Sequence, residues 1–494
     1  MAHNAPSRLQ SPTTESGRSG LRPNLLGVPG VTFMVVSAAA PLTVMAGVAP
    51  IALSIGGVGV PLGYLVAGIV LCIFSVGFTA MAKEIPQTGG FFVYIGHAFG
   101  GVAGFASAVA AIVAYNALQI GVYGLFAVQA QDAFEVLLGV SLPWPFIAVV
   151  AVGLVWLLGY FGLDVGIKVL GVLILLESGI LALMGLSIVA HGGATGLEFS
   201  SFSPSHLTDP GVLAVVGVCF AAFMGFESTV LYRAEARNPE RTIPRATYVA
   251  VGFMGLFYAF IVWSVVQALG EANTVAEAGK QGPTLFFNVI GSHVGGWAEK
   301  LTYVLIVTRV YASQLAFHNA INRYVHALAR VGGLPSALGR LHPRTGSPYV
   351  AGAVQSVVAL SVIGLCAFAG LDPFRDLLIS VNTPGVVGIV ALQGLASLAA
   401  VAYFLRQPPT RKSRVLAGSA VLSSVLMLGV IYLFIKNIAV LTGAGQSVNV
   451  VLLLIMPVVF AAGVVGALWL RRVRPEVIER MGRQSDVGAE VVAS

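Results

Sequence analysis

The stretch that decides the fold runs from Gly211 to Ala246 and reads GVLAVVGVCFAAFMGFESTVLYRAEARNPERTIPRA. Its first part, from Val212 to Leu231, is apolar and about twenty residues long, which is enough for a helix to cross a bilayer. Gly225 lies inside this span, and Glu227 follows two residues later. Ionisable groups at membrane depth are rare and usually face a cavity or a partner. The stretch therefore predicts a membrane helix that is broken at a functional site; the alternative is a Glu that reaches the interface from a helix end.

The composition places the chain among multi-pass membrane proteins. Of its 494 residues, 57% are hydrophobic and 10% are charged, whereas about a quarter are charged in an average soluble domain. The net charge of +7 would suggest nucleic-acid binding in a soluble protein, but the basic residues here lie between apolar segments. We therefore expect no nucleic-acid partner. The three cysteines have no metal-ligand spacing, and we expect no metal and no cofactor.

Twelve apolar segments follow an amino-terminal stretch, residues 1–24, that lacks the pattern of a cleaved signal and is expected to be a disordered cytoplasmic tail. The segments span about 30–54, 60–82, 100–130, 144–162, 167–190, 212–233, 247–269, 297–328, 349–370, 377–404, 415–436 and 449–470. If the amino terminus is inside, 22 of the 27 lysines and arginines lie on the cytoplasmic side. Since basic residues are retained inside, both termini are predicted to be cytoplasmic.

The first span also carries an interruption. Pro41 lies within it and removes a backbone hydrogen bond, so the helix is expected to break, with a simple kink as the alternative. A pair of interrupted spans at corresponding positions is typical of transporters built from inverted repeats. Because the breaks fall in spans 1 and 6, the repeats would comprise spans 1–5 and 6–10, with the last two spans appended.

Two motifs resemble the amino acid–polyamine–organocation transporter superfamily. The first is F-x-G-F-E followed by E-x-x-N-P-x-R-x-I-P-x-A, from Phe223 to Ala246. The second is P-x-x-G-G-x-x-x-Y, at Pro86, Gly89, Gly90 and Tyr94. The resemblance implies an all-α membrane protein of the LeuT type, with a five-plus-five inverted repeat in 25–404 and discontinuous helices 1 and 6. Two more spans, 405–470, and a cytoplasmic tail, 471–494, would follow.

The two breaks predict the substrate site. An interrupted helix exposes N–H groups that can hold a carboxylate and carbonyl groups that can hold an ammonium. The side-chain spacing in span 3 puts polar groups on one helix face, which packs against another helix or lines a cavity. The predicted substrate-binding residues are Ala40, Pro41, Leu42, Thr43, Tyr115, Gln119, Phe223, Met224, Gly225 and Phe226. The superfamily usually has a G-S-G-type triplet where this chain has Ala40 to Thr43, so the resemblance leaves the substrate open.

Two charges are predicted near the middle of the membrane: Glu177 in span 5 and Arg309 in span 8. An isolated charge is costly there, so we expect them to pair. The resemblance places spans 5 and 8 beside span 1, where a coupling ion binds. We therefore interpret the pair as the coupling group, with a static ion pair as the alternative. His318 in span 8 is expected to be a packing residue.

The polar segment after span 6 is predicted to form part of an inner gate, or else a topological anchor. The gate residues would be Glu227, Arg233, Glu235 and Arg241. The broken apolar segment between spans 7 and 8 predicts an outer lid, and the NTPG run from Asn382 to Gly385 predicts a further interruption in span 10.

The chain is thus predicted to be a secondary transporter of the cell membrane rather than an enzyme. It would move an amino acid or related amine by alternating access, coupled to protons or by exchange. An inorganic ion carrier or channel is the alternative, although no repeated filter segment is present. The last two spans are expected to act as a scaffold or as a homodimer contact.

Overall fold

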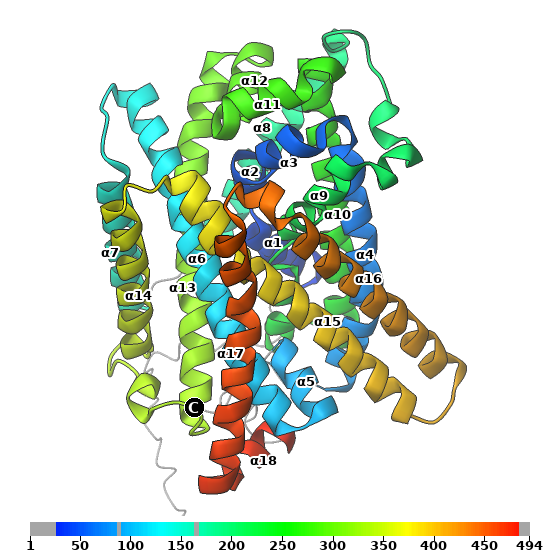
Figure 1. Cartoon of the computed structure of the whole chain (residues 1–494), viewed down its shortest axis with the longest axis vertical. Helices are drawn as coiled ribbons and strands as arrows, with labels where there is room; N and C mark the ends of the chain where they lie inside the picture. Colours follow the sequence, from blue (N-terminus) through cyan, green and yellow to red (C-terminus); the bar gives the residue numbers. More distant parts are fainter. Residues whose placement is uncertain (1–25, 86–89, 163–166, 484–494) are drawn as a thin grey trace, which may run out of the picture.

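The computed structural model describes residues 26–85, 90–162 and 167–483, which form an all-helical protein (Figure 1). The first half contains α1 (Val28–Ala39), α2 (Pro41–Gly47), α3 (Ala49–Gly56), α4 (Val60–Glu84), α5 (Phe91–Phe99), α6 (Gly101–Leu138), α7 (Trp144–Tyr160) and α8 (Ile167–His191). The second half contains α9 (Pro210–Ala221), α10 (Pro239–Leu269), α11 (Thr274–Gln281), α12 (Leu285–His293), α13 (Gly296–Arg330), α14 (Tyr349–Phe368), α15 (Asn382–Arg406), α16 (Arg411–Thr442), α17 (Gln446–Val473) and α18 (Pro475–Arg483). The predicted tail at 1–24 lies outside the described residues, as do Pro86 and Gly89.

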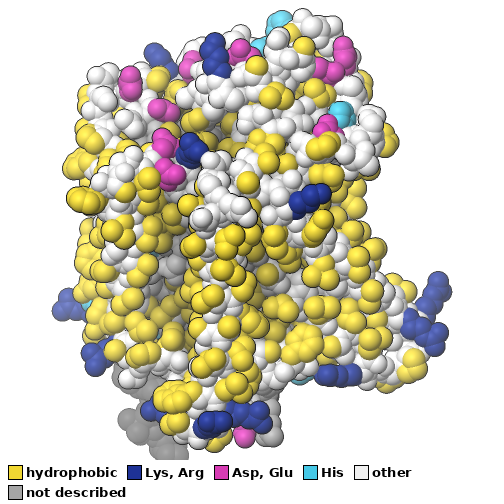
Figure 2. Space-filling view, in the orientation of Figure 1, with side chains coloured by type: hydrophobic (Ala, Val, Ile, Leu, Met, Phe, Trp, Pro, Cys, Tyr) yellow, Lys and Arg dark blue, Asp and Glu magenta, His cyan; other side chains and the backbone are white. Residues whose placement is uncertain are grey.

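Ten segments of the described chain are helical, long and apolar enough to cross a membrane. The other two of the twelve predicted spans correspond to α7, which has 17 residues, and to α13, which carries Arg309 and His318. Figure 2 shows hydrophobic side chains around the sides of the molecule, with charged side chains mostly above and below them. The protein is therefore an all-helical multi-pass membrane protein, and the count of twelve spans stays a prediction.

The first span is interrupted, as predicted. Helix α1 ends at Ala39, and α2 begins at Pro41 after Ala40 adopts a φ of 50°. A residue that precedes proline is disfavoured in the α conformation, because the proline ring collides with it. The proline also has no N–H to continue the helix, whereas it is well tolerated in the first turn of a new one.

The sixth span is interrupted too. Helix α9 ends at Ala221, and the 3-10 helix η4 (Phe226–Ala234) starts after a turn in which Gly225 has a φ of 106°. Glycine is the residue that adopts this backbone conformation without a steric penalty. Beyond η4, the chain passes beside the start of the first span, where Leu26 forms an isolated parallel bridge with Ala236.

The two breaks lie against each other. A Cβ atom added at Gly225 would lie 3.1 Å from the Cβ of Ala38 and 3.5 Å from the backbone nitrogen of Ala39. Helices α8 and α10 pack against α1, α8 and α13 pack against α2, and α10 packs against η4. Residues that are separated by almost two hundred positions in the chain thus form one site in the core.

Span 10 differs from its prediction. The expected interruption at Asn382–Gly385 is a change from a π-helix, η8 (Pro373–Val381), to α15, and the backbone stays helical. Pro384 thus lies within one helical stretch, Pro373–Arg406, and the change from π-helix to α-helix just before it is the irregularity that takes the place of a break.

The segment between spans 7 and 8 folds into the short helices α11 and α12. Helix α11 packs on α3, and α12 packs on α13 and α8 (Figure 1). At eight and nine residues they are too short to span, as predicted. Within the predicted tail 471–494, α18 packs against α5 and α6, so this part of the tail is ordered on the body of the protein.

Candidate functional site

An ion pair connects four helical segments around the first break. The Nε of Arg309 lies 3.1 Å from Oε1 of Glu177, and both side chains are 1% exposed. The other oxygen of Glu177 accepts a hydrogen bond from the backbone N–H of Leu42, at 3.3 Å, and Nη1 of Arg309 donates to Oγ of Ser37, at 2.9 Å. The expected pairing is confirmed, and it joins α1, α2, α8 and α13.

The charges of this pair match the helix ends that they contact. Glu177 reaches the amino terminus of α2, where backbone N–H groups carry partial positive charge. Arg309 reaches Ser37 in the last turn of α1, where free carbonyl groups carry partial negative charge. The pair therefore stabilises both ends of the interrupted helix. Ser37 was not among the predicted site residues; its position three residues before the break is the signal that could have indicated it.

Three polar groups near the first break lack a hydrogen-bond partner in the described part of the chain. They are Nη2 of Arg309, Oγ1 of Thr43 and the hydroxyl of Tyr258, all of them buried. Buried polar groups are nearly always bonded to protein, water or ligand. These groups are therefore suited to bind a polar ligand or water at the break. Tyr258, in the middle of α10, was not among the predicted site residues, because nothing in its sequence surroundings distinguishes it from other aromatic residues in the spans.

A second carboxylate occupies the other break. Glu227 accepts a hydrogen bond from the hydroxyl of Tyr115 at 2.9 Å and another from the backbone N–H of Gly225 at 3.0 Å. Its side chain is buried, and among the described residues it forms no ion pair. The ring of Tyr115 stacks on Tyr324 of α13, with ring centroids 5.8 Å apart. Glu227, which was predicted as a gate residue, thus contacts Tyr115, which was predicted as a substrate-binding residue. Tyr324 packs against the other side of this contact through the ring of Tyr115.

The other predicted binding residues divide into two groups. Phe223 and Phe226 are fully buried. The ring of Phe223 packs edge-on against Tyr258 and that of Phe226 against Phe74, so both side chains pack the second break against its neighbouring helices. Met224 is half-buried at the turn itself. Ala40, Pro41 and Leu42 are buried at the first break.

Gln119 serves helix packing in this conformation. Its amide nitrogen donates to the backbone carbonyl of Gln314 at 3.2 Å, and the amide of Gln314 donates in return to the carbonyl of Gln119 at 3.1 Å. This reciprocal pair joins α6 to α13. His318 likewise packs, as expected: the amide of Gln355 in α14 hydrogen-bonds both its Nδ1 and its carbonyl group.

The other predicted gate residues, which follow Glu227 in the chain, have different partners. Arg233 donates to the backbone carbonyl of Ala82 at 2.7 Å and so ties η4 to the end of α4. Glu235 faces Arg323 of α13; burial raises the pKa of the Glu235 carboxyl, and Arg323 opposes part of that rise. Arg241 is exposed and forms no ion pair in the described chain. The four residues therefore do not form one ion-pair network.

Comparison with known proteins decides the family. A family model described as amino acid permease matches residues 26–483. The chain belongs to the amino acid permease family. This permease is 26% identical to an uncharacterized transporter of Mycobacterium tuberculosis over 77% of this chain and 84% of that one. It is 24% identical to the serine/threonine exchanger of Bacillus subtilis (60% of this chain, 66% of the relative) and 26% identical to the lysine-specific permease of Lactococcus lactis (47% and 46%). The resemblance seen in the sequence is confirmed, and the protein is an amino acid transporter of the membrane.

A small cavity of about 80 Å³ lies between α2, α9 and α15 in this permease. Gly47 of α2, Ala221 of α9 and Leu378 of η8 line it, together with Asn382 and Thr383 of α15. The Oδ1 of Asn382 is buried and has no hydrogen-bond partner in the described residues. Span 10 therefore contributes polar groups beside spans 1 and 6.

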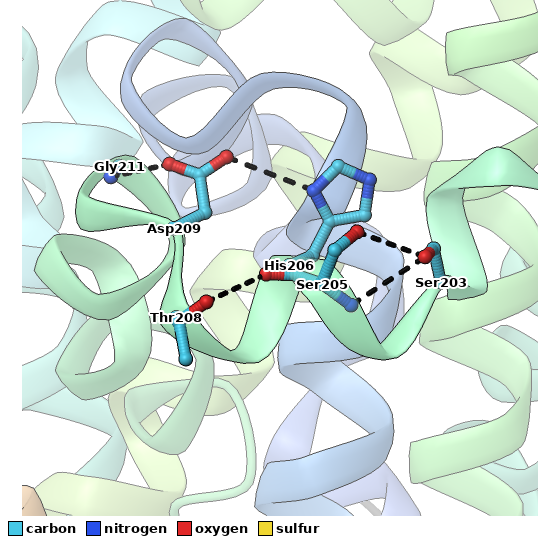
Figure 3. Close-up of polar contacts among 6 residues, drawn as sticks. All are labelled: Ser203, Ser205, His206, Thr208, Asp209 and Gly211. Atoms are coloured by element: carbon cyan, nitrogen blue, oxygen red, sulfur yellow. Dashed lines mark hydrogen bonds and ion pairs between the residues drawn. The ribbon is translucent and has the colours of Figure 1, made fainter.

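The first half of span 6, helix α9, is anchored by the loop that precedes it (Figure 3). Asp209 caps α9 by accepting a hydrogen bond from the N–H of Gly211 at 2.9 Å, and His206 lies 3.6 Å from its other oxygen. Ser203 and Thr208 close the short helix η3 (Pro204–Thr208) with local hydrogen bonds. These contacts hold the start of α9 in place, which leaves the break at its other end to be held by Glu227.

Proposed function

We propose that this permease is a secondary transporter that moves an amino acid or related amine by alternating access around the paired breaks. The observation that carries the proposal is the contact of Gly225 with Ala38 and Ala39. It brings the free backbone groups of two interrupted helices to one place at membrane depth. Such groups can bind a carboxylate and an ammonium without a catalytic side chain.

The charges around the breaks support a substrate with an ammonium group. Glu227 is buried, accepts hydrogen bonds from neutral donors and lacks a cationic partner among the described residues. The ammonium group of a ligand would neutralise its carboxylate. For a carboxylate, Nη2 of Arg309 and Oγ1 of Thr43 are available near the first break. We take the binding residues to be those predicted from Ala40 to Thr43 and from Phe223 to Phe226, with Tyr115 and Gln119 on the facing helix.

We further propose that Glu177 and Arg309 form the coupling group. The guanidinium lies beside the first break, where it would repel sodium, so coupling to protons or exchange is favoured. The cycle would separate and rejoin the pair as α1 and α2 move against α8 and α13. Both termini would be cytoplasmic, the core would be an inverted repeat of five plus five spans, and the segment from Glu227 to Arg241 would support the inner gate.

The test is uptake of radiolabelled amino acids, polyamines and potassium into proteoliposomes. The wild type is expected to concentrate one organic class, and Gly225→Val to abolish its binding, since the added side chain would fill the space against Ala38. Gly364→Val is the matched control, because a side chain at Gly364 of α14 meets no protein atom within 4 Å. Unchanged substrate affinity in Gly225→Val would contradict the site, and uptake of potassium alone would favour an ion carrier.

A further inference from the structure

A groove of about 420 Å³ runs between α4 and α10 on the outside of the transporter. Its floor is the contact between Gly68 and Gly255, whose backbones approach so closely that a Cβ at Gly68 would lie 3.2 Å from the Cα of Gly255. Ile69 and Leu256 form its rim and are 60% and 69% exposed. Both helices are membrane spans, so this groove opens towards lipid.

The length of the groove fits one leaflet. On α4 it extends from Leu65 to Val76, which is about 16 Å at 1.5 Å per residue. Half of a hydrocarbon core of about 30 Å is about 15 Å. Its walls carry almost only apolar groups, and Tyr248 marks the inner end. Tyrosine is typical of the boundary between hydrocarbon and headgroups. The groove therefore has the length and the apolar walls that an acyl chain of one leaflet would require.

Two arginines of α10 lie beyond the inner end of the groove. On α10, Arg241, Arg245, Tyr248 and Gly252 follow one another at spacings of four, three and four, which places them on one face of the helix. Arg241 and Arg245 are exposed, and neither forms an ion pair in the described chain. Arg245 is one turn below Tyr248, at the level where a phosphate would lie.

The acidic groups nearby do not neutralise these arginines. Glu240 is paired with Lys83 of α4, with Nζ and Oε2 3.5 Å apart. Glu84, the last residue of α4, lies near Tyr403 of α15. The charge that remains beside the groove is that of the two arginines.

We propose that this groove binds an anionic phospholipid, with one acyl chain between α4 and α10 and the headgroup phosphate at Arg245 and Arg241. The groove opens on the outside of α4 and α10, and Phe223 of the second break lies behind its floor. It joins span 2, which belongs to one proposed repeat, to span 7, which belongs to the other. A lipid bound there would contact both halves of the transporter at once.

The test is native mass spectrometry of the purified full-length protein with phosphatidylglycerol or phosphatidylcholine added in detergent. The wild type is expected to retain phosphatidylglycerol preferentially. Gly252→Leu should lose this retained lipid, because a side chain at Gly252 meets no protein atom within 4 Å and so fills the groove rather than the protein. Gly364→Leu, which is equally unobstructed on α14, should retain it.

Two further variants complete the test. Cys72→Phe fills the groove from the α4 wall and should act like Gly252→Leu, so the result does not depend on the folding of one variant. Arg245→Gln should lower the preference for phosphatidylglycerol over phosphatidylcholine by about fivefold, the contribution of one basic residue near an anionic surface. Equal retention of the two lipids by the wild type, or undiminished retention in both groove-filling variants, would overturn the proposal. An unchanged preference in Arg245→Gln would overturn the assignment of the headgroup.

Discussion

Each helix break contains a buried carboxylate at the start of a half-helix, but the two carboxylates are held differently. Glu177 comes from α8, is neutralised by Arg309 and contacts α1 and α2 through the pair. Glu227 belongs to η4 itself and accepts hydrogen bonds from Gly225, the residue that precedes η4, and from Tyr115 of α6. The first cluster joins four elements across the molecule, whereas the second stabilises a turn and leaves one negative charge uncompensated.

This difference separates two roles. A group whose partners lie on four elements changes its surroundings whenever those elements move, so its charge state is linked to the conformation of the transporter. A group held mainly by its own turn keeps its surroundings through the same movement. We therefore assign coupling to the Glu177 pair and substrate contact to Glu227, and four predictions follow this assignment.

The largest effect is expected when one partner of the ion pair is removed. Arg309→Ala should lower the stability of the folded protein by about 3–5 kcal/mol, because it leaves the Glu177 carboxylate buried without its counter-charge. Thermal unfolding in detergent measures this. The double variant Glu177→Leu with Arg309→Met should recover most of the loss, since it buries no charge. If Arg309→Ala is as stable as the wild type, the first break does not depend on its ion pair, and the difference drawn here between the two breaks is wrong.

The next prediction concerns the driving force. Glu177→Gln should abolish accumulation driven by an imposed pH gradient in sodium-free proteoliposomes but permit exchange of labelled for unlabelled substrate. Glu227→Gln is the matched variant at the second break, and it should keep its response to the gradient even if its rate falls. If the response is lost in Glu227→Gln and kept in Glu177→Gln, coupling belongs to the second break.

Substrate affinity tests the second cluster directly. Tyr115→Phe removes a hydrogen bond to a carboxylate, which contributes about 1.5–3 kcal/mol, so the KM for substrate should rise roughly tenfold or more. Asn116→Ala is the control on the same helix, because within the described chain the Asn116 side chain bonds to the carbonyl of Ile112 one turn away. We expect its KM to stay within about twofold of the wild type. Equal effects of the two variants would mean that the loss of affinity comes from a disturbed packing of α6 and not from the bond between Tyr115 and Glu227.

The smallest effect is expected at the inner surface. Arg241→Glu should lower the transport rate by less than about twofold and leave membrane insertion unchanged, because Arg241 is exposed and unpaired in the described chain and exposed charges contribute little. Arg233→Gln should lower the rate more, since Arg233 ties η4 to the carbonyl of Ala82. Transport and insertion are measured separately. A severe defect of Arg241→Glu in insertion would identify an anchor rather than a gate.

Much of the fold was predictable because its features are local in the chain. The long apolar segments, the non-spanning segment before α13 and the breaks at Pro41 and Gly225 all rest on properties of consecutive residues. In span 10 the same local reasoning was wrong. The helix continues through Pro384 after a change from a π-helix to an α-helix, and the sequence does not mark where that change occurs.

The sequence by itself predicted a transporter with two interrupted spans and a pair of charges within apolar spans, and its motifs indicated the family. Only the tertiary structure decided what each side chain contacts. It paired Gln119 with Gln314 in helix packing, placed Tyr115 against Glu227, and bonded Arg233 to the carbonyl of Ala82. The physical reason is that backbone breaks arise from local steric limits, whereas the partner of a buried polar group depends on how distant helices are positioned against one another.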